Sequence, residues 1–141
     1  MIESRELRIG NYVKYGTDDM PVILPIYTGR VAAIGLLGII TFGNEPYNHI
    51  HMPKARIVHC EGIPLTGEVL SEWCGFEKDI HFYTKRITTE LQVTVGVKSG
   101  DLSLMTPYFG TDFPMPHIKY LHQLQNMIYA VSGRELEVKT P

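Results

Sequence analysis

The chain has 141 residues, of which 44% are hydrophobic and 20% charged, and its formal net charge is −2. This length suits one hydrophobic core, so we expect residues 1–141 to form a single domain. General nucleic-acid binders usually carry a basic excess, so the charge balance argues against nucleic acid as a partner. The charged N-terminal stretch lacks the apolar core of a signal peptide, and no apolar run could cross a bilayer. We therefore expect a cytoplasmic protein with no membrane partner.

The first half of the chain predicts short strands. Residues Leu7–Tyr15 alternate apolar and polar side chains, which is typical of a half-buried strand. Two more strands are expected at Tyr27–Ile34 and Leu37–Phe42, separated by glycines that suit tight turns or bulges. Three short strands at this spacing predict either an antiparallel sheet or an SH3-like, partly closed barrel. A loop over Gly43–Lys54 and a strand over Ala55–Cys60 follow.

A short helix is expected in the middle of the chain. Thr66 is a good N-cap, and apolar residues follow it at helical spacing. Gly75 supplies a stop in the left-handed conformation, and Phe76 can pack back onto the helix.

The second half predicts more strands and the clearest helix. The alternating strand segments are Ile80–Thr84, Glu90–Val97 and Leu102–Met105, with a last short strand at Glu135–Lys139. The segment between Met105 and His117 contains three prolines and predicts irregular structure. Helical periodicity runs over Ile118–Ser132, where Leu121, Leu124 and Ile128 should be buried, and Gly133 should end the helix. The fold class expected from this order is α+β, with antiparallel strands, one short middle helix and one C-terminal amphipathic helix.

The polar face of the C-terminal helix carries no charge between Lys119 and Arg134. Solvent-facing helix surfaces usually carry Glu, Lys and Arg, whereas this one carries amides, an imidazole and a phenol: His122, Gln125, Asn126 and Tyr129. Such groups form fixed hydrogen bonds. The face therefore packs on the sheet, packs on another subunit or forms a wall of a ligand pocket. Packing on another subunit would make the protein a homo-oligomer.

A second polar cluster lies in the expected loop. Tyr47, Asn48 and His49 combine flat aromatic faces with hydrogen-bonding groups, which suits ligand contact, although a packed polar loop is the simpler interpretation. No Cys, Asp or Glu cluster accompanies the histidines, so no metal site is expected. Arg86 follows a strand and is a candidate for holding an anion.

No catalytic motif is present. The chain lacks GxSxG, a Walker A loop, HExxH and CxxC, so neither catalytic residues nor a cofactor are expected. Cys60 and Cys74 lie among apolar neighbours and are expected to be free buried thiols.

Three segments carry a family resemblance. ELRIGNYV at Glu6–Val13, IPLTGEVLSEWCGFEK at Ile63–Lys78 and IKYLHQLQNMIYAVSGRELEV at Ile118–Val138 cover about a third of the chain. Together they resemble a set of small proteins encoded by bacteriophages and prophages. That set has no assigned activity, so the resemblance implies a phage-related origin rather than a reaction.

Short phage proteins without catalytic motifs are often accessory factors directed at the host. We therefore expect a non-enzymatic protein that binds and sequesters a small anionic, nucleotide-like ligand, inhibiting host anti-phage signalling. The first alternative is a protein–protein interaction or assembly module with the C-terminal helix as interface. A small-barrel nucleic-acid-binding module is the next alternative, and an enzyme is the last.

Overall fold

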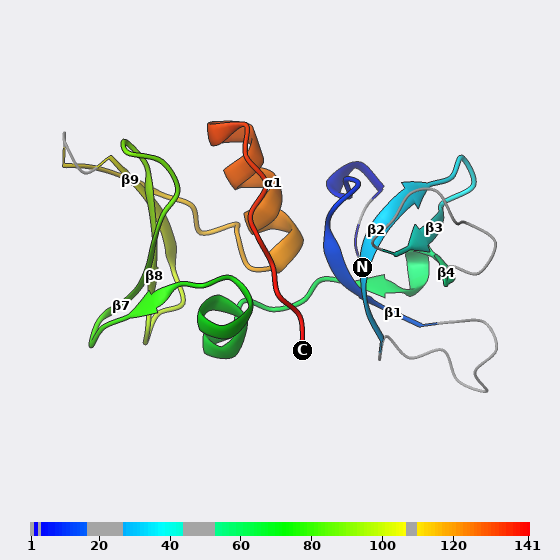
Figure 1. Cartoon of the computed structure of the whole chain (residues 1–141), viewed down its shortest axis with the longest axis horizontal. Coiled ribbons are helices and arrows are strands. Elements are labelled where there is room, and N and C mark those ends of the chain that lie inside the picture. Colours follow the sequence, from blue (N-terminus) through cyan, green and yellow to red (C-terminus); the bar gives the residue numbers. More distant parts are fainter. Residues whose placement is uncertain (1, 3, 17–26, 44–52, 107–109) are drawn as a thin grey trace. The chain divides into compact units, whose positions relative to one another are not determined.

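The computed structural model describes residues 2, 4–16, 27–43, 53–106 and 110–141. The fold is mixed α+β, with antiparallel strands in both halves, as the sequence predicts (Figure 1). The chain divides into two compact units, Met1–Ile63 and Pro64–Pro141. The single-domain organisation of residues 1–141 stays a prediction.

The first unit contains one five-stranded antiparallel sheet. Its strands lie in the order β4-β3-β2-β1-β5, and the sheet is open rather than closed into a barrel. Of the two predicted architectures, the antiparallel sheet is therefore the correct one. The elements are η1 (Ser4–Glu6), β1 (Tyr12–Tyr15), β2 (Tyr27–Ile34), β3 (Ile39–Phe42), β4 (Lys54–Arg56), η2 (Ile57–His59) and β5 (Cys60–Glu61).

The first strand begins at Tyr12, five residues later than predicted. A turn precedes it, in which the Asn11 side chain accepts a hydrogen bond from the Arg8 backbone N–H at 2.8 Å. Gly10 in this turn has a φ of 98°, which other residues rarely adopt. The turn breaks the predicted alternation: Leu7 and Val13 are buried, but Ile9 is 57% exposed.

A cluster of apolar side chains forms the core of this unit. Its members on β1 and on β3 lie two residues apart and therefore share one face of each strand, and Cys60 on the edge strand β5 is fully buried within the cluster. The buried members are Ile2, Leu7, Val13, Tyr15, Val31, Ile40, Phe42, Ala55 and Cys60.

The second unit contains an antiparallel meander in the order β10-β9-β8-β7-β6. Its strands are β6 (Glu77–Lys78), β7 (Phe82–Arg86), β8 (Gln92–Gly96), β9 (Leu102–Thr106) and β10 (Thr111–Pro114). The last of these falls in the segment predicted to be irregular. It pairs with β9 from Thr111↔Thr106 to Pro114↔Ser103. As an edge strand, β10 tolerates a proline, because its outer side needs no backbone donor.

The middle helix forms as predicted. Its π-helical part is η3 (Val69–Trp73), and the Thr66 hydroxyl accepts a hydrogen bond from the Val69 N–H at 3.3 Å. Gly75 ends it with a φ of 73°. Phe76 then donates its N–H to the Leu70 carbonyl at 2.9 Å and is buried, which confirms that it packs back on the helix.

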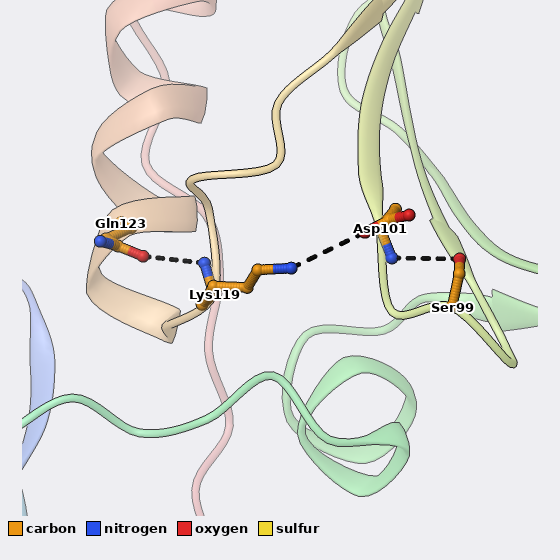
Figure 2. A network of polar contacts seen from close by, with 4 residues as sticks. All are labelled: Ser99, Asp101, Lys119 and Gln123. Carbon is orange, nitrogen blue, oxygen red and sulfur yellow. Dashed lines mark hydrogen bonds and ion pairs between the residues drawn. The ribbon is translucent and has the colours of Figure 1, made fainter.

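The C-terminal helix α1 (Leu121–Ser132) begins three residues later than predicted. The Gln123 side chain accepts hydrogen bonds from the Lys119 and Tyr120 backbone N–H groups at 2.8 and 3.1 Å, which caps the helix start. Figure 2 shows the bond to Lys119 and, beyond it, the ion pair of that lysine with Asp101 at 3.7 Å. Gly133 ends the helix with a φ of 70°. The predicted burial of Leu121, Leu124 and Ile128 is confirmed.

The tail after α1 forms no strand, so the prediction for Glu135–Lys139 is wrong. It is held instead by Leu136, which is buried, and, within the described part of the chain, by one backbone bond from the Lys139 N–H to the Trp73 carbonyl at 2.8 Å. One backbone bond does not make a ladder. Among the helices that the structure describes, none has both the length and the apolar character to cross a membrane.

Candidate functional site

The residues predicted to contact a ligand fall in three places. Tyr47, Asn48 and His49 lie outside the described residues. Arg86 is exposed at the end of β7. The remaining four, His122, Gln125, Asn126 and Tyr129, all lie on α1.

The α1 residues differ in their access to solvent. His122 and Gln125 are 1% exposed, Asn126 is half-buried, and Tyr129 is 45% exposed. The His122 ring stacks near Tyr120, with 6.0 Å between centroids and 15° between planes. Because His122 and Gln125 are enclosed by the protein, Tyr129 is the member of this set that presents a broad surface to a ligand or partner.

A cleft of about 300 Å³ lies in the second unit and is lined by other residues. We call it the Trp73 cleft. Its lining comes from the end of η3, from β7 and from the tail after α1: Glu72, Trp73, Cys74, Gly75, Lys85, Glu137 and Lys139.

Three local features shape the Trp73 cleft. The positive φ of Gly75 turns the chain away from η3. A Cβ built on Gly75 would lie 3.3 Å from the Lys85 Nζ, so the absence of a side chain there leaves room for the amine. The bond from the Lys139 N–H to the Trp73 carbonyl holds the tail against the end of η3. Two lysines from separate segments thereby reach the same cleft as the single tryptophan of the chain.

The charges of the cleft are mixed. Lys139 lies 3.7 Å from the Glu137 carboxylate, an exposed pair that water screens. Cys74 is buried, and burial raises the pKa of its thiol to about 12, although the nearby Lys85 acts in the opposite direction. The thiol is therefore protonated at neutral pH.

A second, more apolar hollow of about 270 Å³ lies between two turns of the same sheet. It is lined by Ile80, His81, Phe82, Gly96, Lys98 and Ser99. The Asp79 carboxylate fixes one of these turns by accepting the His81 and Phe82 backbone N–H groups, each at 2.7 Å. The hollow combines aromatic surface with a single lysine, fewer cations than the Trp73 cleft offers.

The sequence did not single out the residues of the Trp73 cleft as a group. Trp73 falls among the apolar residues that the sequence places at helical spacing after Thr66, and Cys74 is expected to be a buried thiol. Lys85 directly precedes Arg86 and belongs to no motif. A tryptophan followed within two residues by a helix-ending glycine was the local signal that this side chain sits at an open helix end.

Within the described ranges, no group of three or more His, Cys, Asp or Glu side chains is placed to hold a metal ion. No protein-family model, no curated protein and no solved structure matches this chain.

Proposed function

We propose that this is a non-enzymatic phage or prophage accessory protein that binds and sequesters a small anionic, nucleotide-like ligand in the host cytoplasm. One observation carries the proposal: Trp73, Lys85 and Lys139 line the same cleft. An aromatic ring can stack on a base and lysines can bind a phosphate, so this combination suits a base joined to a phosphate.

The chemistry of recognition follows from the side chains. An aromatic face that stacks on a base contributes about 1–3 kcal/mol. A charge-assisted hydrogen bond from a lysine to a phosphate contributes about 1.5–3 kcal/mol. The cleft volume of about 300 Å³ lies at the lower end of ligand sites, which favours a mononucleotide over a larger dinucleotide.

Binding without reaction is supported by the state of the one thiol in the cleft. The thiolate, not the thiol, is the nucleophile of cysteine chemistry. A pKa of about 12 keeps Cys74 protonated at neutral pH. Among the residues that the structure describes, no histidine lines the cleft to act as its base. A ligand held there is expected to leave unchanged, which is what sequestration requires.

Calorimetry against mononucleotides, cyclic nucleotides and ADP-ribose-type nucleotides tests this proposal. We expect at least one of them to bind, and Lys85→Met and Lys139→Met each to weaken binding about tenfold or more. Lys98→Met removes an exposed lysine of the same unit outside the Trp73 cleft and should leave binding unchanged. Mass spectrometry of the ligand released by denaturation should find it intact. If no nucleotide binds, or if the released ligand has been cleaved, the proposal is wrong.

The second candidate function is a protein–protein interaction or assembly module. It is favoured by Tyr129 and Val131, which are both exposed on the last turns of α1. A second copy of the chain packed there would make a homo-oligomer. Light scattering should then show a dimer at micromolar concentration that Val131→Asp dissociates, whereas a monomeric wild-type protein would rule this interface out.

A further inference from the structure

The hairpin of β2 and β3 ends in two leucines that are fully exposed. Leu36 and Leu37 show 106% and 90% of their reference surface to solvent. The turn is closed by hydrogen bonds from the Gly35 N–H to the Ile39 carbonyl at 2.8 Å and from the Gly38 N–H to the Gly35 carbonyl at 3.1 Å. Turn positions of this kind usually hold Asn, Asp, Ser, Gly or Pro. Because the bonds fix the turn, the fold itself holds both leucines outward.

Further apolar side chains surround the two leucines. Ile34 and Ile39 flank the turn and are partly exposed, and so is Val58 on η2. The Ile57 N–H donates to the Gly38 carbonyl at 2.7 Å, which holds η2 beside the turn. We call this set of five residues the apolar tip: Ile34, Leu36, Leu37, Ile39 and Val58. Figure 1 shows the turn between β2 and β3 extending beyond both strands.

Positive charge lies behind the apolar tip. On β4, Arg56 is opposite Ile39 and Lys54 is opposite Thr41, and both cations are exposed. The strands β2, β3 and β4 themselves contain no Asp or Glu. At the rise of a β-strand, Arg56 is roughly 7 Å and Lys54 roughly 13 Å behind Leu37.

We propose that the apolar tip inserts into an anionic lipid surface. The leucines of the tip would lie at the boundary of the acyl chains, and the cations behind the tip would lie at the phosphate headgroups. This is the order of the layers in such a surface. Interfacial apolar elements bury to a depth of about 5–10 Å, so Arg56 would reach the headgroups when the leucines are buried. Lys54, roughly 6 Å farther back, would lie within one screening length of them.

A second copy fits the apolar tip less well, because pairing two tips brings the same cations together with no carboxylate of these strands between them. The proposal departs from the sequence expectation of no membrane partner. That expectation rested on spanning segments, and a peripheral contact needs none.

Flotation with lipid vesicles tests the insertion directly. The full chain should bind vesicles of phosphatidylglycerol mixed with phosphatidylcholine, and bind pure phosphatidylcholine more weakly. Added salt should weaken binding to the anionic vesicles, because it screens the cations.

Variants separate the apolar and the charged contributions. The double variant Leu36→Ser, Leu37→Ser should reduce binding to anionic vesicles about tenfold or more, since the buried apolar surface is lost. Lys54→Glu should weaken binding to anionic vesicles and leave the weak binding to pure phosphatidylcholine unchanged. Ile80→Ser removes an apolar residue of the other unit that is 85% exposed and should leave vesicle binding unchanged. Circular dichroism should show all variants folded, because the substituted side chains are exposed.

Two outcomes would overturn the proposal. The first is that the wild-type chain does not bind anionic vesicles, or binds them as well when both leucines are replaced. The second is a dimer in light scattering that the double leucine variant dissociates, because the apolar tip would then be covered by a second copy.

Discussion

The rings of Tyr15 and Phe42 stack across the strand that separates them, with 3.9 Å between centroids and 10° between planes. Tyr15 is on β1 and Phe42 on β3, and both strands pair with β2 between them. The two rings meet over Gly29 of β2, where a Cβ would lie 2.7 Å from the Tyr15 ring and 2.9 Å from the Phe42 ring. The two rings can therefore stack only because Gly29 has no side chain.

Replacing Gly29 by alanine should destabilise the protein. One added methyl group must displace one of the two rings, and overpacking of this kind costs about 1–3 kcal/mol. Urea unfolding of Gly29→Ala should show this loss. Thr28→Ala, at the exposed neighbouring position, should change the free energy of unfolding by less than about 0.5 kcal/mol. A Gly29→Ala variant as stable as the wild type would contradict the stacked arrangement.

The Gln123 side chain should stabilise the start of α1. Gln123→Ala removes the acceptor of two backbone N–H groups and should cost about 0.5–2 kcal/mol. Gln123→Glu keeps the acceptor oxygens and places a negative charge in the first turn, so this variant should be at least as stable as the wild type. Urea unfolding of both variants checks the pair, and equal destabilisation by Ala and Glu would speak against a capping role.

The two free thiols should make the protein less stable in alkali. Burial raises the pKa of Cys60 to about 11 and that of Cys74 to about 12, from an ordinary value near 9.0. Below the ordinary pKa, the contribution of both thiols to the stability of the folded state is fully present. It is lost as the pH rises through the folded-state pKa values, because the unfolded chain releases its thiol protons at a lower pH than the folded chain does. Each thiol lowers the free energy of unfolding by at most about 1.4 kcal/mol per pH unit there.

Urea unfolding between pH 8 and pH 10 measures this decline. Cys74→Ala should show a shallower decline than the wild type, whatever its stability at neutral pH. Alkylation without reductant should modify both cysteines only after denaturation. Rapid alkylation of the folded chain would contradict their burial.

The Asp79 carboxyl should titrate below its ordinary pKa of 3.8. Hydrogen bonds from the backbone N–H groups of Phe82 and His81 stabilise the carboxylate and lower its pKa. Its contribution to stability is present above pH 3.8 and is lost as the pH falls through the lower, folded-state value. Carbon NMR should report the lowered pKa, and the amide signals of Phe82 and His81 should shift with the same midpoint. An Asp79 pKa at or above 3.8 would contradict the hydrogen bonds that form this turn.

The chain is expected to unfold in one transition. Units of fewer than about 80 residues rarely gain more than about 3–5 kcal/mol from one core, which favours the predicted single domain over two independently stable units. Scanning calorimetry should show a single peak whose calorimetric and van't Hoff enthalpies agree. Two separate peaks would mean that Met1–Ile63 and Pro64–Pro141 are independent domains.

Local sequence determined the elements whose signals lie within a few residues. Thr66, Gly75 and Phe76 define the middle helix through bonds to groups three to six residues away. The apolar period of α1 and its stop at Gly133 depend on the same short range. These predictions are confirmed because helix caps and periodicity need no knowledge of distant contacts. The Leu7–Tyr15 strand was shortened for a local reason too, since the Asn11 side chain favours a turn that alternation does not reveal.

Distant contacts decided the rest. The edge strand β10 exists because β9 offers it a backbone ladder, although β10 ends in Pro114 and Pro116 follows it in the sequence. The Trp73 cleft joins an exposed helix end, a strand and the tail, so its two lysines are 54 residues apart and share no motif. The residue type of Gln125 makes it a candidate ligand contact in the sequence. Only the tertiary structure decides that Gln125 is buried and that Leu36 and Leu37 are exposed. Burial depends on which segments meet, and that is a property of the folded chain rather than of any one segment.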